Sequence, residues 1–128
     1  MRSNSHPTVL LTGFGPFPNV PRNASAVIVK RLAREARLAL PHVRFAVAVL
    51  PTEWTRAPGL VSELHERHDP VLALHFGVTS GMRGFRIETE ARNFCRMSPD
   101  AAGGLPASNC ICEGGASALA ASIPATAV

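Results

Sequence analysis

The pattern of apolar and polar positions predicts strands and helices that alternate along the chain. Residues 9–11 form a short apolar run that leads into Thr12 and a loop of glycine and phenylalanine. Residues 43–49 alternate Val and Phe with Arg and Ala, the period of a second strand, which Pro51 closes. Residues 71–76 are a nearly continuous apolar run, as expected of a strand covered on both faces. These segments predict the strands of a sheet.

Two helices are expected between the strands. Asn23 is a favourable N-cap for the first, which ends near Pro41. Its predicted inward row is Ala24, Ile28, Leu32 and Ala36, backed by Val27. The second runs from about residue 58 to residue 67 with Leu60, Val61 and Leu64 inward, and Asp69 and Pro70 end it. Strand, helix, strand, helix, strand is the pattern of a parallel α/β fold.

The rest of the chain is less regular. A loop with three glycines leads into residues 85–94, where apolar and charged side chains alternate, so a fourth strand is expected there at an edge. Residues 98–106 have loop composition, and residues 110–112 predict a very short fifth strand. Residues 116–128 are rich in alanine, are interrupted by Pro124 and receive no assignment.

Length and composition narrow the function classes. A chain of 128 residues suits a single domain, 1–128, with a real core. The net charge of +4 comes from scattered arginines without a basic patch, which argues against nucleic acid. No apolar run approaches the roughly 20 residues of a membrane span, and residues 1–7 lack a signal-peptide core. Three cysteines, an odd number, favour reduced thiols. We expect a soluble cytoplasmic protein that binds neither nucleic acid nor membranes.

The most informative segment is Thr-Gly-Phe-Gly-Pro-Phe at positions 12–17. It brings Phe14 and Phe17 to the carboxyl edge of the sheet, where open α/β folds place their ligands. Gly13 and Gly15 could also cradle a phosphate, but Pro18 stands where a dinucleotide fingerprint has its third glycine. Packing of the two rings against the following helix is the plain alternative to both.

Four polar side chains are candidates for catalysis or metal binding. Glu88 is the carboxylate of interest, although Glu88 and Glu90 share a strand face with two arginines, which is typical of a charge-compensated solvent face. His65 and His68 have a metal-compatible spacing without a third ligand, so solvated histidines are expected. His75, within an apolar run, is expected to be a core histidine with a satisfied partner.

The cysteines form no recognisable reactive pair. A cysteine nucleophile needs a histidine base within hydrogen-bond reach, and nothing in the sequence places one beside Cys95, Cys110 or Cys112. The Cys110 and Cys112 pair is also weak as a metal site, because no second pair or adjacent histidine accompanies it.

Several segments match a known pattern in the same order along the chain: residues 10–17, 23–25, 50–52, 75–78, 87–88 with 91–93, 99–103 and 110–115. Taken together, they resemble the pyroglutamyl-peptidase I family, the pyrrolidone-carboxylate peptidases of cysteine peptidase family C15. The resemblance implies a three-layer α/β/α sandwich with a mostly parallel central sheet. It also implies a cytosolic, metal-free, cofactor-free cysteine exopeptidase that removes amino-terminal pyroglutamate from peptides.

The resemblance assigns roles to three residues. Phe14 and Phe17 match the aromatic residues that sandwich the lactam ring, and Glu88 matches the carboxylate that orients the catalytic histidine. The family's nucleophile lies in a later Ala-Gly-x-Tyr-x-Cys-Asn segment, and its histidine lies later still. No cysteine or histidine of this chain matches either one, and the alignment leaves open whether Arg96 matches a family arginine.

The chain is therefore expected to be an amino-terminal portion of such a peptidase, with a sheet incomplete at its carboxyl end. A frameshift, a premature stop or a gene-boundary error would each produce it, and the portion alone is expected to be inactive. The alternatives are a non-catalytic homologue that binds pyroglutamyl peptides or pairs with another subunit, including a homo-oligomer, and a protein that binds a nucleotide or phosphate through the Gly13-Phe14-Gly15 turn.

Overall fold

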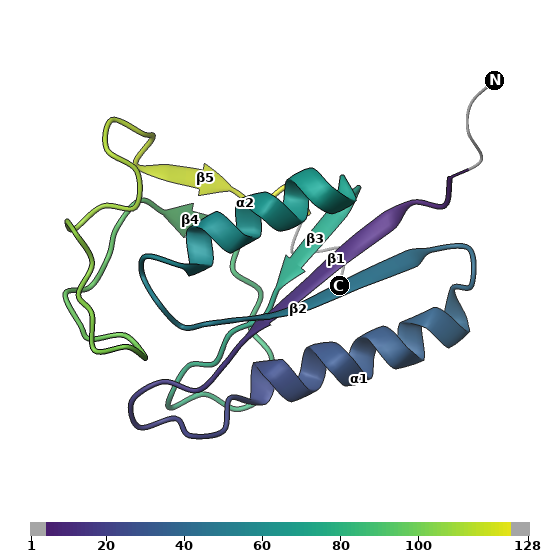
Figure 1. Cartoon of the computed structure of the whole chain (residues 1–128), viewed down its shortest axis with the longest axis horizontal. Coiled ribbons are helices and arrows are strands. Elements are labelled where there is room, and N and C mark those ends of the chain that lie inside the picture. The colour runs from purple at the N-terminus through teal and green to yellow at the C-terminus, as the bar shows by residue number, and fades with distance from the viewer. Residues whose placement is uncertain (1–4, 124–128) are drawn as a thin grey trace.

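The computed structural model describes residues 5–123 (Figure 1). Pro124 and the rest of residues 124–128, like residues 1–4, lie outside the described part, and so do the expectations that fall on them. In chain order the elements are β1 (Thr8–Phe14), α1 (Ala24–Ala39), β2 (Arg44–Leu50), α2 (Ala57–His68), β3 (Leu72–His75), β4 (Glu90–Arg92) and β5 (Ala118–Ala120).

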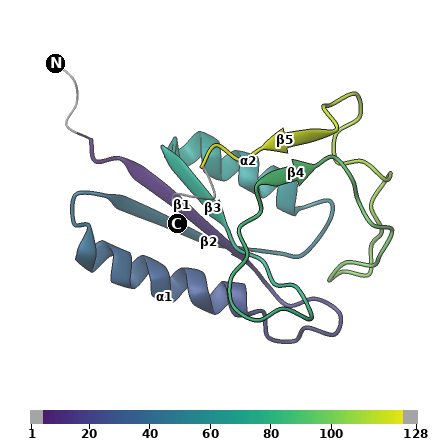
Figure 2. The ribbon, with the colours of Figure 1, turned by 180° about the vertical axis from the view of Figure 1, so that it is seen from behind.

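The first three strands form a parallel sheet in the order β2-β1-β3. Leu11 of β1 lies between Val47 of β2 and Leu74 of β3, so the first strand in sequence is the central one. Helices α1 and α2 lie on opposite sides of this sheet in both views (Figures 1 and 2). The predicted α/β class with a mostly parallel sheet is confirmed, as are the three strands and two helices that make it.

The core lies between the sheet and α1. Leu11, Val29 and Ala33 are buried there, and partly buried side chains of β1, β2, β3 and the residue after β3 pack around them: Val9, Phe45, Val47, Leu74 and Phe76. Successive side chains of a strand point to opposite faces, so Leu10 and Thr12, also fully buried, face the α2 side. Within residues 5–123, no helix is long and apolar enough to cross a bilayer.

The buried face of α1 differs from the predicted one. Its buried residues are Ser25, Val29 and Ala33, whereas Ala24, Val27 and Leu32 are exposed and Ile28 and Ala36 are half-buried. The cause is a close approach at Gly13, where an added Cβ would lie 2.5 Å from the carbonyl oxygen of Ser25. That contact turns the Ser25 row toward the sheet and rotates the larger apolar row toward solvent.

The third strand is less covered than its apolar run suggested. Leu72 to Leu74 are half-buried and His75 is exposed. Among the described strands, β3 pairs with β1 and has no neighbour on its outer edge. The expectation of a strand covered on both faces was therefore wrong for this chain.

The segment after β3 was predicted incorrectly in two places. Of residues 85–94 only Glu90–Arg92 form a strand, and residues 110–112 form none. Instead β5 pairs antiparallel with β4 in a separate two-stranded sheet. The side chain of Asn93 explains the second error, since it accepts from the amides of Ile111 and Cys112 and donates to the carbonyl of Cys112. Residues 98–106 are loop, as expected.

Replacing Gly13 by alanine tests the close approach. Gly13→Ala forces β1 and α1 apart, and overpacking of this kind typically costs about 1–3 kcal/mol. We expect the free energy of unfolding, measured in urea, to fall by that amount.

Gly59 supplies the matched control. It lies in α2, and an added Cβ would meet no atom within 4 Å. Gly59→Ala should raise stability by roughly 0.5–1 kcal/mol, because alanine loses less conformational entropy in a helix. Equal effects of the two substitutions would contradict the proposed contact.

Candidate substrate-binding edge of the sheet

The loop after β1 is a closed turn that carries both candidate phenylalanines. Phe14 is the last residue of β1 and Phe17 stands three positions later, and both are half-buried. Phe17 and Val20 exchange backbone hydrogen bonds of 3.2 and 2.8 Å around a turn whose Asn19 has a left-handed φ of 66°. We call residues 14–20 the aromatic loop.

The first turn of α1 fixes this loop. The backbone N–H of Phe14 donates to the hydroxyl of Ser25 at 2.9 Å. That hydroxyl donates to the Asn23 carboxamide oxygen at 2.7 Å, which also accepts from the Ser25 amide at 3.1 Å as the helix N-cap. The predicted cap is confirmed, and it also anchors the aromatic loop.

Gly15, between the two phenylalanines, is held on both sides. Its N–H donates to the Leu50 carbonyl at 2.8 Å. Its carbonyl accepts from the Asn23 side chain at 3.0 Å and from the Thr52 hydroxyl at 2.9 Å. Since the amides of Phe14 and Gly15 are both used internally, they are not available to cradle a phosphate, which weakens the nucleotide hypothesis.

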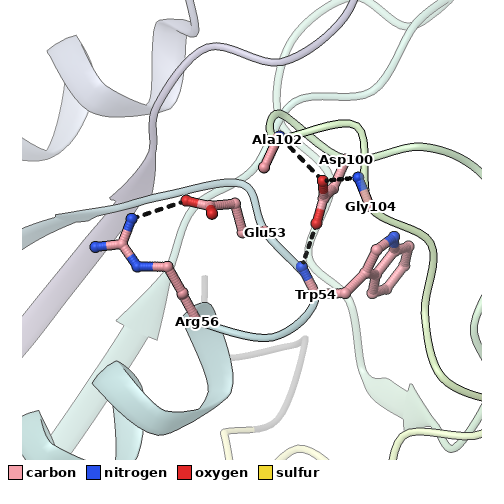
Figure 3. Close-up of polar contacts among 6 residues, drawn as sticks. All are labelled: Glu53, Trp54, Arg56, Asp100, Ala102 and Gly104. Carbon is pink, nitrogen blue, oxygen red and sulfur yellow. Dashed lines mark hydrogen bonds and ion pairs between the residues drawn. The ribbon is translucent and has the colours of Figure 1, made fainter.

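The segment after β2 is braced in turn by Asp100 (Figure 3). Asp100 is 8% exposed, and its carboxylate accepts from the amides of Trp54, Ala102 and Gly104 at 2.9, 3.0 and 2.8 Å. These hydrogen bonds hold the pKa of Asp100 below its ordinary value of 3.8, and the bond from Trp54 has the largest effect. Burial acts in the opposite direction. A buried carboxylate with three donors is a fixed structural charge.

His75 ends β3 at the same edge. Its Nδ1 shares a hydrogen bond of 2.6 Å with the Thr12 hydroxyl, and its ring centroid lies 6.2 Å from that of His65 on α2. Partial desolvation lowers the pKa of His75 below 6.5, and repulsion from His65 lowers it further. The expected partner is present, but the expectation of a core position was wrong, because the edge of β3 is open.

Glu88 lies on the surface. Its side chain is 70% exposed and its carboxylate pairs with Arg86 at 2.9 Å, while Glu90 pairs with Arg92 at 3.3 Å. This is the charge-compensated surface that periodicity predicted. No hydrogen bond or ion pair among the described residues joins Glu88 to the aromatic loop.

The cysteines are all free thiols. Cys95 is buried, Cys110 is half-buried beside the Ser108 hydroxyl at 3.4 Å, and Cys112 is exposed. In the range 5–123 no three His, Cys, Asp or Glu side chains are grouped to hold a metal ion, so His65 and His68 find no third ligand there.

Two shallow grooves lie on the surface. One is lined by β2 and α2, including Leu50, Leu60 and Leu64, and the other by residues at the amino end of the sheet, including His6 and His68. Neither is lined by Phe14, Phe17 or Glu88.

A family model of pyroglutamyl peptidases matches residues 7–128. The chain belongs to the pyroglutamyl peptidase family. It is 31% identical over 121 residues to human (Homo sapiens) pyroglutamyl-peptidase 1, a match that covers 94% of this chain and 56% of the human protein. It is 35% identical over 126 residues to pyrrolidone-carboxylate peptidase of Cupriavidus necator, covering 94% and 55%. The chain thus spans little more than half the length of these relatives.

Solved structures of family members share the fold. Pyroglutamyl peptidase I of Bacillus amyloliquefaciens superimposes with a TM-score of 0.82 at 29% identity, covering 94% of this chain and 58% of that one. A mutant pyrrolidone carboxyl peptidase of Pyrococcus furiosus gives 0.83 at 26% identity, covering 94% and 57%. The chain therefore has the α/β fold of the family. Its sheet is incomplete, which is consistent with its covering only 58% and 57% of the two solved chains.

Periodicity did not single out Thr52 and Asp100, which fix this edge. The sequence carries a signal for each one. Thr52 follows the proline that closes β2, and Asp100 precedes Gly103 and Gly104 in a composition typical of turns in which an aspartate accepts from nearby amides. Neither signal indicates the distant segment that each residue contacts.

The lowered pKa of His75 predicts a pH dependence. The fold favours the neutral imidazole, so its contribution to stability is complete above the ordinary pKa of 6.5 and is lost as the pH falls through that value toward the lower folded pKa. We expect the free energy of unfolding to decrease between about pH 7 and pH 5, and this decrease to be smaller in His75→Gln. The exposed His42, in the turn before β2, supplies the control His42→Gln, which should keep the slope. An unchanged slope in His75→Gln would contradict the assignment.

Proposed function

We propose that this chain is the pyroglutamyl-recognition part of a pyroglutamyl peptidase, with peptides that carry amino-terminal pyroglutamate as its ligands. The match to the family over residues 7–128 is the observation that carries the proposal. The fixed aromatic loop at the carboxyl edge of the sheet supports it, since this is where such folds bind ligands.

Phe14 and Phe17 are the proposed walls for the lactam ring. Pyroglutamate presents a flat, uncharged ring, which apolar side chains suit. The backbone amides of Phe14 and Gly15 are already bonded within the protein, so these parts of the loop offer apolar surface more than free donors. Both rings are half-buried and therefore retain surface for contact.

Glu88 is proposed to orient the catalytic histidine of the complete enzyme. The support is the spacing of Ile87, Glu88 and Asn93, which resembles the family pattern. In the present structure its carboxylate binds Arg86, so the histidine would have to compete with or join that exposed pair. Exposed pairs of this kind are weak, about 0–1 kcal/mol, and exchange readily.

We propose further that residues 1–128 form one domain of a cytoplasmic protein and do not hydrolyse pyroglutamyl amides on their own. The odd number of cysteines, which argues against a disulfide framework, supports the location. A pocket without its thiolate and base binds but does not acylate. A non-catalytic homologue that binds pyroglutamyl peptides is the second candidate, favoured by the intact aromatic loop.

Binding of free pyroglutamate to the purified chain tests the recognition role. Saturating ligand should raise the melting temperature, because a ligand that binds the native state alone stabilises it. Phe14→Ala and Phe17→Ala should each remove most of that shift.

Phe85→Ala is the matched control for these substitutions. The Phe85 side chain is 83% exposed in the loop before β4, so its removal should leave the shift intact. Proline, a five-membered ring without the lactam carbonyl, should give no shift. No response to pyroglutamate at high concentration would sink the recognition proposal.

A fluorogenic pyroglutamyl amide tests the lack of turnover. We expect no hydrolysis above background with the chain alone, since no cysteine lies beside a histidine among the described hydrogen bonds. Turnover that disappears when Cys95, Cys110 or Cys112 is replaced by serine would show that the nucleophile is in this chain. Turnover that survives all three replacements would indicate different chemistry.

A further inference from the structure

Asp100 is a buried charge without a counterion among the described ion pairs. Burying a carboxylate is costly unless hydrogen bonds replace its water, and three backbone amides do so here. The three donors fix both carboxylate oxygens, so Asp100 holds the segments that supply these amides rigidly together.

Two of the three donors shape the loop of Asp100 itself. Ala102 and Gly104 lie two and four positions later, and the Asp100 amide closes the turn on the Gly104 carbonyl at 2.9 Å. Gly103 in this turn has a φ of 78°, a conformation that favours glycine. Oδ1 of Asp100 is therefore used within its own turn, and Oδ2 is left to accept from another segment.

The third donor, the amide of Trp54, comes from a segment 46 positions away (Figure 3). Two further hydrogen bonds join the same segments: the Ala101 amide to the Thr52 carbonyl at 2.9 Å, and the Trp54 indole N–H to the Ser98 carbonyl at 3.0 Å. The backbone from Thr52 to Trp54 is thus held against the Asp100 turn.

Thr52 extends this link to the aromatic loop. Its carbonyl is held by Ala101, and its hydroxyl donates to the carbonyl of Gly15. Gly15 lies between Phe14 and Phe17, so a shift of Thr52 would change the distance and tilt between the two rings.

We propose that Asp100 is a positioning residue for the aromatic loop, acting through Trp54 and Thr52 on Gly15. No hydrogen bond among the described residues joins Asp100 directly to the aromatic loop. Its effect on ligand rests on the proposed recognition role of Phe14 and Phe17, whereas its effect on Gly15 does not.

The experiment follows Gly15 and Trp54 in the chain of residues 1–128. The chain has one tryptophan and no tyrosine, so its emission reports on Trp54, and the Gly15 amide is followed by ¹⁵N-resolved NMR. In Asp100→Asn, we expect the Trp54 emission and the Gly15 and Phe17 amide signals all to change, with the far-ultraviolet circular dichroism preserved. Affinity for pyroglutamate should fall roughly tenfold, equivalent to about 1.4 kcal/mol.

Glu53→Gln is the matched control. Glu53 precedes Trp54, and its carboxylate pairs with Arg56 at 3.0 Å at the start of α2 (Figure 3). This variant removes a charge from the same segment and should leave the Gly15 and Phe17 signals and the affinity unchanged. The same signal changes in Glu53→Gln would overturn the proposal, because the effect would then belong to the segment and not to Asp100.

A pH titration separates positioning from general support. In the unmodified chain the Gly15 amide shift should follow protonation of Asp100, with a midpoint below 3.8, and the step should be missing in Asp100→Asn. A step at Trp54 without one at Gly15 would overturn the proposal.

Thr52→Val keeps the test decisive if Asp100→Asn does not fold. It removes the hydroxyl bond to Gly15 and retains the backbone bond to Ala101. The Gly15 and Phe17 signals should change while the Trp54 emission stays, and unchanged Gly15 and Phe17 signals would overturn the proposal. Failure of the unmodified chain to bind pyroglutamate would contradict the recognition role alone, since the Gly15 measurements still decide the role of Asp100.

Discussion

Gly13 has no side chain, and the carbonyl of Ser25 lies where one would be. This approach brings the first turn of α1 onto the end of β1, close enough for the Ser25 hydroxyl to accept from Phe14 and for Asn23 to reach Gly15. The side chains that cap the helix therefore also shape the aromatic loop. The missing Cβ of Gly13 thus permits the contacts on the helix side of the aromatic loop and favours the Ser25 row of α1 against the sheet.

The opposite side of the aromatic loop depends on polar groups. Thr52 holds the Gly15 carbonyl from the β2 side, and the Asp100 turn holds Thr52 and Trp54. Buried polar links of this kind are favourable when every group is satisfied, and residues 5–123 contain no buried side-chain nitrogen or oxygen without a partner. The polar groups that hold the two rings in place are thus engaged within the protein.

Local patterns predicted the central architecture, because the periods of strands and helices and the cap at Asn23 are encoded in neighbouring residues. The errors arose where distant groups decide. The rows of α1 that begin at Ala24 and at Ser25 are both apolar enough to face the sheet. The close approach of Gly13 to Ser25 favours the second row. Residues 110–112 have the composition of a strand, but the amides of Ile111 and Cys112 donate to the Asn93 side chain and not to another strand. The loop between the first strand and the first helix placed Phe14 and Phe17 at the carboxyl edge of the sheet, whereas only the family resemblance suggested a role for them.

The central place of β1 has a consequence for synthesis. Its neighbours are β2 and β3, and Phe76 supplies the last side chain of the core cluster, so the sheet and α1 can pack once residue 76 has left the ribosome. Asn23, Ser25 and Thr52 are already present at that moment, but Asp100 is not. Every side chain that bonds the aromatic loop directly is therefore synthesised before the carboxylate that braces the segment of Thr52 from outside.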